Sequence, residues 1–138
     1  MDQHVIHPEI DQDSATFWDS AREHKVKIQR CDSCGKFRFP PSPSCYYCGQ
    51  IGATWKLIEG IGTVYSWIVI HHPVDKRLAN EVPFIVALVE IAEGPRIVGR
   101  MHESNPENMR AGMAVQIEYT DIDSELTLIN FKPAIESK

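Results

Sequence analysis

The chain has 138 residues, which is enough for one ordinary domain or two small ones. Hydrophobic residues make up 43% and charged residues 24%, as in a typical soluble globular protein. The sequence has no apolar run of the roughly 18 residues that a transmembrane helix needs, and the polar N-terminus lacks the pattern of a signal peptide. We therefore expect a cytoplasmic protein that has no contact with a membrane, in which paired cysteines favour metal ligation over disulfides.

The charge is unevenly distributed along the chain. The segment Arg22–Arg38 contains six basic and two acidic residues, although the whole chain has a net charge of −5. An acidic chain is poorly suited to coating a nucleic-acid backbone. The basic segment could contact a small anionic ligand or an acidic patch on a partner. The alternative is a solvated face that offsets the negative charge of nearby thiolates.

A short helix is predicted for the stretch "DSATFWDSAREHK", from Asp13 to Lys25. Asp13 or Ser14 can cap its N-terminus. Phe17 and Trp18 share one face, together with an alanine one turn later. Two interpretations remain open, because these aromatic residues could either anchor the helix on the protein or dock onto a partner.

All four cysteines lie in two Cys-x-x-Cys pairs separated by ten residues. Each pair is followed by glycine, which allows the backbone to turn so that amides reach the sulfur atoms. Four thiolates at this spacing suit tetrahedral Zn2+ in a closed, structural site. Iron is the second choice of metal, and free or disulfide-bonded cysteines are the remaining alternative. The predicted ligands are Cys31, Cys34, Cys45 and Cys48.

From Leu57 onward the sequence pattern becomes that of β-strands. Runs rich in β-branched and aromatic residues alternate with turn signals. Five strands within such a length are typical of a small closed β-barrel, whose interior is filled by side chains. The predicted strands are Gly62–His72, Pro83–Ile91, Arg96–His102, Ala114–Asp121 and Leu126–Pro133.

The sequence predicts no catalytic site. His71 and His72 end the first of these strands, but neighbouring residues on a strand point to opposite faces and cannot act as a pair. The turn "AEGP" lacks the repeated glycines of a phosphate-binding loop. Acidic residues at the strand ends are interpreted as solvated.

The order of these motifs resembles that of the DUF35 family. The similarity extends from about Thr16 to Pro133 and rests on "FWDSAREHKVKIQRC", "FPPSPSCYYCG", "GIGTVYSWIVIH", "PFIVALVEIAEGPRIVGRM" and "LTLINFKP". The resemblance implies a mostly β protein: an N-terminal helix, a rubredoxin-like zinc ribbon and a five-stranded OB-fold barrel. The expected division is tail and helix 1–25, ribbon 26–56, barrel 57–133 and C-terminal tail 134–138.

The resemblance also implies a function. Such proteins are small partners of thiolase-like and other acyl-CoA-processing enzymes, for example in the breakdown of aromatic or steroid compounds, and the catalytic residues belong to the partner. We therefore expect a non-catalytic accessory subunit that could bind CoA or acyl-CoA on its surface or at the ribbon–barrel junction. The candidate phosphate contacts are Arg22, Lys25, Arg30, Lys36 and Arg38.

Two other functions remain open at this point. Zinc ribbons and OB-folds also bind nucleic acid through stacking aromatic residues and a basic groove. Residues 57–133 carry six basic and eleven acidic side chains, which opposes such a groove. The second is an independent acyl-CoA enzyme that uses His71 or His72.

Overall fold

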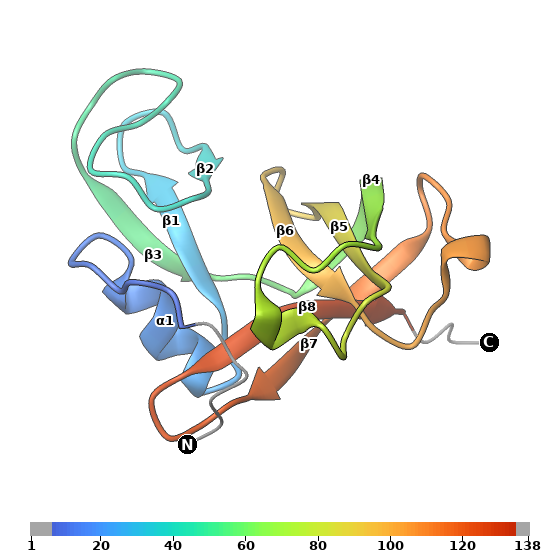
Figure 1. Cartoon of the computed structure of the whole chain (residues 1–138). Coiled ribbons are helices and arrows are strands. Elements are labelled where there is room, and N and C mark those ends of the chain that lie inside the picture. The colour runs from blue at the N-terminus through green and yellow to red at the C-terminus, as the bar shows by residue number, and fades with distance from the viewer. Residues whose placement is uncertain (1–6, 135–138) are drawn as a thin grey trace.

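A computed structural model describes residues 7–134 of the chain (Figure 1). The predicted tail 134–138 therefore lies outside the described residues except for Ala134, as do the first six residues. Within the described part, no helix has the length and apolar character needed to cross a membrane. The elements are α1 (Ala15–Arg22), β1 (Lys27–Cys31), β2 (Phe37–Arg38), β3 (Ala53–Leu57), β4 (Ile61–Ile70), η1 (Lys76–Leu78), β5 (Phe84–Ile91), β6 (Arg96–Met101), η2 (Pro106–Asn108), β7 (Ala114–Asp121) and β8 (Thr127–Pro133).

Helix α1 is shorter than predicted at both ends. At its start, the Ser14 amide donates to the Asp11 carboxylate and the Asp11 amide donates to the Ser14 hydroxyl. At its end, His24 takes a left-handed conformation with φ of 59°, and the amide of Lys25 donates to the carbonyl of Ser20. This is the hydrogen-bond pattern that closes many helices, and it prevents the helix from continuing to Lys25.

The ribbon is a three-stranded antiparallel sheet in the order β2-β1-β3. Strand β3 lies outside the predicted strands, the first of which begins at Gly62. Its five residues pair with all of β1, from Lys27 opposite Leu57 to Cys31 opposite Ala53. The sheet therefore holds the end of the cysteine-rich segment against its beginning.

The remaining strands form a closed barrel in the order β4-β5-β6-β8-β7, with β7 pairing back to β4. All five lie within about two residues of their predicted positions. The β6–β8 contact is parallel and the other pairings are antiparallel. The mostly β fold with an OB-like barrel is thus confirmed.

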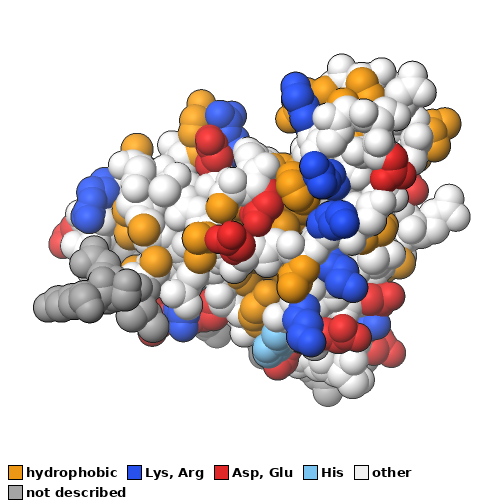
Figure 2. All heavy atoms as spheres, turned by 180° about the vertical axis from the view of Figure 1, so that it is seen from behind, with side chains coloured by type: hydrophobic (Ala, Val, Ile, Leu, Met, Phe, Trp, Pro, Cys, Tyr) orange, Lys and Arg blue, Asp and Glu red, His pale blue; other side chains and the backbone are white. Residues whose placement is uncertain are grey.

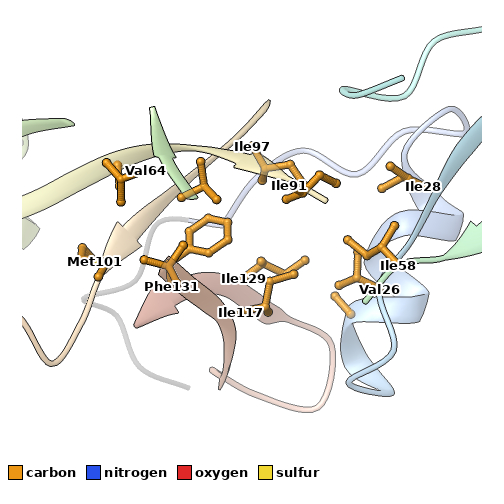
Figure 3. Packing of buried hydrophobic residues seen from close by; sticks show 14 of the residues in the cluster. Val26, Ile28, Ile58, Val64, Ile91, Ile97, Met101, Ile117, Ile129 and Phe131 are labelled. Atoms are coloured by element: carbon orange, nitrogen blue, oxygen red, sulfur yellow. The ribbon is translucent and has the colours of Figure 1, made fainter. Parts of the chain in front are cut away.

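Ribbon, helix and barrel share one hydrophobic core, as Figure 3 shows. Phe131 lies among the barrel residues of this core and is fully buried. Val26 and Ile28 of the ribbon and Ile58 of the connection continue the same cluster. The position of the ribbon relative to the barrel is therefore fixed by packing.

The aromatic residues of α1 serve this packing. Phe17 is buried, and its ring centroid lies 5.2 Å from those of both Trp18 and Phe39. Phe39 belongs to the segment that leads out of the ribbon sheet. The interpretation of Phe17 as an anchor is confirmed, whereas only the half-buried Trp18 retains an accessible edge.

Candidate metal centre and neighbouring surface

The two cysteine pairs form two knuckles of the same construction. In the first, the amide of Gly35 donates to the Cys31 carbonyl, and in the second the amide of Gly49 donates to the Cys45 carbonyl. The two glycines have φ values of 77° and 78°, which favour glycine over any residue with a side chain. The same local backbone thus presents two thiols from each side of one centre.

The four Sγ atoms lie within 4.8 Å of one another. The Sγ atoms of Cys31 and Cys48 are 3.6 Å apart, as are those of Cys34 and Cys45. A tetrahedral zinc site with Zn–S bonds of about 2.3 Å has S–S edges of about 3.8 Å. These distances suit tetrahedral zinc and are too long for disulfides. The centre fits a structural zinc ion, and Cys31, Cys34, Cys45 and Cys48 would hold it.

Backbone amides at the knuckles favour the thiolate form of Cys31 and Cys45. The amides of Cys48 and Tyr47 lower the pKa of the Cys45 thiol to about 6, and the amide of Cys34 lowers the pKa of Cys31. The Tyr47 amide lies 3.4 Å from the Cys45 sulfur. The Gln50 amide lowers the pKa of Cys48, but burial and the neighbouring thiols outweigh it and raise that pKa to about 11. Since zinc binds thiolates, metal binding at neutral pH must displace the proton of Cys48, whereas Cys45 is already disposed to lose its own.

Most of the predicted basic residues are exposed. Figure 2 shows a row of Lys and Arg side chains along the ribbon half of the molecule. Arg22 binds Asp19 and the Glu125 carbonyl, Arg30 donates to the Gly35 carbonyl, and the Lys36 ammonium lies 4.6 Å from the Tyr47 ring centroid. Lys25 is also exposed.

Arg38 does not belong to this surface, and its assignment as a phosphate contact is wrong. Its side chain is only 2% exposed. The guanidinium donates to the Gln29 side chain and to the Ser42 carbonyl, so it ties β1 to the proline-rich segment. Strand β2 is only two residues long, which gave the sequence pattern too little alternation to reveal an inward-facing arginine.

A polar hollow of about 420 Å³ lies beside the first knuckle. Arg30 and Lys56 contribute the basic side chains of its wall, and Asp32 contributes an acid whose carboxylate accepts a hydrogen bond from the Thr54 hydroxyl at 2.7 Å. Lys56 was not predicted as a site residue because β3 was not recognised. The pairing of Lys56 with Ile28, two residues before Arg30, places both cations on one face of the ribbon sheet.

A second hollow of about 370 Å³ lies at the ribbon–barrel junction. Aromatic residues of the ribbon line one side, and the β5–β6 turn lines the other. The hollow thus combines aromatic rings with one acidic and one basic side chain, Glu90 and Arg96. The other lining residues are Phe39, Tyr46, Tyr47, Gly94 and Pro95.

The histidines at the end of β4 contribute to none of these hollows. His71 and His72 are both exposed. Other histidines pair with carboxylates instead: His24 lies 2.8 Å from Asp121 and stacks on Tyr119, and His102 bonds to Glu118. The His24 contact joins the end of α1 to the barrel, and its separation of 97 residues explains why the sequence did not reveal it.

Comparison with known proteins identifies the family. The model of the ChsH2 rubredoxin-like zinc ribbon matches residues 18–50, and the model of the ChsH2 C-terminal OB-fold matches residues 55–120. A DUF35 domain-containing scaffold protein of Methanocaldococcus jannaschii is 30% identical, over 70% of this chain and 68% of that protein. The chain belongs to the DUF35 family.

Two longer relatives are more similar in sequence. A protein of Thermomonospora curvata described as a probable enoyl-CoA hydratase alpha subunit is 41% identical over 93% of this chain. The 3-oxo-4,17-pregnadiene-20-carboxyl-CoA hydratase alpha subunit of Mycobacterium tuberculosis is 35% identical over 85% of it. The chain spans only 40% and 37% of the lengths of these two relatives.

The fold has a close counterpart among solved structures. A chain of the Ltp2–ChsH2(DUF35) aldolase superposes with a TM-score of 0.84 at 40% identity, over 94% of this chain and all of that chain. The ribbon, helix and barrel of this chain therefore recur together in one chain of that aldolase structure.

Proposed function

We propose that this chain is a non-catalytic, zinc-containing subunit that assembles with an acyl-CoA-processing enzyme of the hydratase, aldolase or thiolase type. The observation that carries the proposal is the 40% identical match that covers the whole of a chain in the Ltp2–ChsH2(DUF35) aldolase. The two hydratase alpha subunits support the same class of partner. The thiolase type rests on the family resemblance alone.

The zinc ion would act as a structural element in this function. The second knuckle carries Tyr46 and Tyr47, whose rings line the junction hollow. Since Cys45 is the one buried hydrophobic side chain between Pro41 and Gln50, this segment has little apolar burial to order it. Metal ligation would supply that order and so hold the two rings in place.

The basic face of the ribbon could also receive the phosphates of CoA, through Arg22, Lys25, Arg30 and Lys36. This finer proposal is supported by their exposure and by Lys56, which lies on the same face as Arg30. It is opposed by Asp32 and by the negative charge of a zinc ion with four thiolates. Calorimetric titration with CoA and with dephospho-CoA tests this proposal, for the wild type and for the double variant Arg30→Gln with Lys56→Gln. A phosphate site predicts CoA binding that weakens in the double variant, whereas a merely solvated face predicts no binding by either protein.

The test of the main proposal is purification of the tagged full chain from its own cells, with identification of what accompanies it. We expect an acyl-CoA hydratase, aldolase or thiolase subunit in a fixed ratio to this chain. The activity of that enzyme is then measured with and without the chain. An enzyme that neither binds the chain nor changes in activity or stability when it is added would contradict the proposal.

A further inference from the structure

The outer surface of strands β4, β5 and β6 carries an apolar patch, beside which Ser66 pairs with Leu88 as a polar neighbour. In β5 the residues Ile85, Ala87 and Val89 point inward and are buried, so their neighbours point outward. The strand register places Ile68 beside Val86, and Leu88 beside Val98. Ile68 and Val98 are 58% and 61% exposed. We call this surface the outer face and define it by Tyr65, Ile68, Val86, Leu88 and Val98.

Two arginines stacked on aromatic rings flank the outer face. The Arg96 guanidinium lies 3.7 Å from the Tyr65 ring centroid, and the Arg100 guanidinium lies 3.9 Å from that of Phe84. Each arginine also bonds one carboxylate, Glu90 at 3.4 Å and Glu81 at 2.6 Å. A guanidinium has five N–H donors, so each retains donors for a further acceptor.

The outer face is continuous with the junction hollow. Arg96 and Glu90, which border the outer face, also line the hollow, and across the hollow lie Tyr46 and Tyr47 of the ribbon, which are exposed. Half of the large hydrophobic side chains that the described chain exposes lie on this combined surface: Tyr46, Tyr47, Tyr65, Ile68 and Val98. This concentration distinguishes the surface from the scattered apolar residues of an ordinary exterior.

We infer that the outer face and the adjoining junction hollow form the surface to which the acyl-CoA enzyme subunit docks. The inference rests on the proposed function and adds the place and chemistry of the contact. An aliphatic centre with tyrosine and arginine at its rim is the composition of an interaction hot spot between folded proteins. The aliphatic centre and the remaining guanidinium donors together fit a partner surface that presents an apolar patch bordered by acceptors such as carboxylates.

Neither a nucleic acid nor a second copy of this chain fits the outer face as well. Its centre is aliphatic rather than a platform for stacking bases, and residues 57–133 carry eleven acidic but only six basic side chains, which opposes binding of a phosphate backbone. Arg96 and Arg100 lie symmetrically on either side of Val98 on β6. A two-fold axis at Val98 would set Arg96 of one copy against Arg100 of the other, and such like-charge contacts oppose association.

The test compares two exposed positions of equal accessibility. Val98→Lys alters the outer face at a residue that is 61% exposed, whereas Leu57→Lys alters β3 of the ribbon at one that is 60% exposed. Ile68→Lys is a second variant on the outer face. The probe is the acyl-CoA enzyme subunit that copurifies with the full chain, identified by mass spectrometry and produced separately. Zinc content and near-ultraviolet circular dichroism establish that each variant is folded.

We expect Val98→Lys and Ile68→Lys each to weaken binding of that subunit by about 30-fold or more, the loss typical of a hot-spot residue. Leu57→Lys should bind within twofold of the wild type. Equal binding by all three variants would overturn the inference while leaving the proposed function intact. Self-association or single-stranded DNA binding that Val98→Lys abolishes would overturn it in favour of another occupant. If no acyl-CoA enzyme copurifies, the proposed function and the inference both fail.

Discussion

Gly49→Ala tests whether the knuckle backbone is coupled to zinc binding. Gly49 has a φ of 78°, and a Cβ added there would meet nothing within 4 Å. The substitution therefore introduces backbone strain without a steric clash. A residue with a side chain in this left-handed conformation costs roughly 1–2 kcal/mol relative to the right-handed one.

This backbone strain should make zinc binding less favourable. With Cys45 as the one buried hydrophobic side chain of its knuckle, the metal-free segment can relax to a conformation that alanine tolerates. Zinc binding must then restore the left-handed conformation, at a cost of 1–2 kcal/mol. We expect the zinc affinity to fall by about 5- to 30-fold, as measured by competition with a chelator at fixed pH.

Gly94→Ala is the matched control. Gly94 has a φ of 116° in the β5–β6 turn, and its added Cβ would likewise meet nothing within 4 Å. It should lower the thermal stability of the barrel and leave the zinc affinity unchanged. If Gly49→Ala binds zinc within twofold of the wild type, the knuckle keeps its conformation without metal, and the reasoning is refuted.

Three further predictions concern the metal, a histidine contact and the core. Cys31→Ser should reduce the zinc content from about one ion per chain to nearly none. Amide hydrogen exchange should increase at the knuckles while the barrel strands stay protected, and loss of protection throughout the chain would contradict this prediction. The His24 hydrogen bond lowers the pKa of Asp121 below its ordinary value of 3.8. The contact therefore stabilises the protein above that pH, and this stabilisation is lost as the pH falls through the folded-state pKa. NMR titration of His24→Ala should show the Asp121 pKa returning toward 3.8, and an unchanged pKa would exclude the contact. Gly99→Ala would bring a Cβ to 2.8 Å from the fully buried Phe131 ring, and we expect a loss of about 1–3 kcal/mol in denaturant unfolding, whereas a loss below about 0.5 kcal/mol would mean that the ring moves freely.

The barrel strands could be predicted because each is a run rich in β-branched and aromatic residues between turn signals, and some of them also alternate. In β7, Val115 and Ile117 alternate with polar residues in the sequence, and both are buried. Strand β3 could not be predicted in the same way. Its side chains are exposed or half-buried on both faces, so its hydrogen bonds to β1, and not a buried face, establish it as a strand.

The metal ligands follow from local spacing, whereas the surfaces around them do not. Only two residues separate the cysteines of each pair, and each knuckle is closed by a local hydrogen bond, from Gly35 to Cys31 or from Gly49 to Cys45. Arg38 shows the limit of this reasoning, because nothing local distinguishes it from the exposed Lys36 two residues earlier. Its burial depends on Gln29 and Ser42, which the fold brings together from two different segments.

Only one end of the docking surface should depend on zinc. Tyr46 and Tyr47 lie on a metal-dependent knuckle, whereas Ile68 and Val98 lie on barrel strands whose packing involves Val89, Ile97 and Phe131. Loss of zinc should thus remove one end of the surface and leave its centre intact. Cys31→Ser should therefore weaken partner binding less than Val98→Lys does. The opposite order would place the main contact on the ribbon, because only there does the metal determine the positions of the side chains.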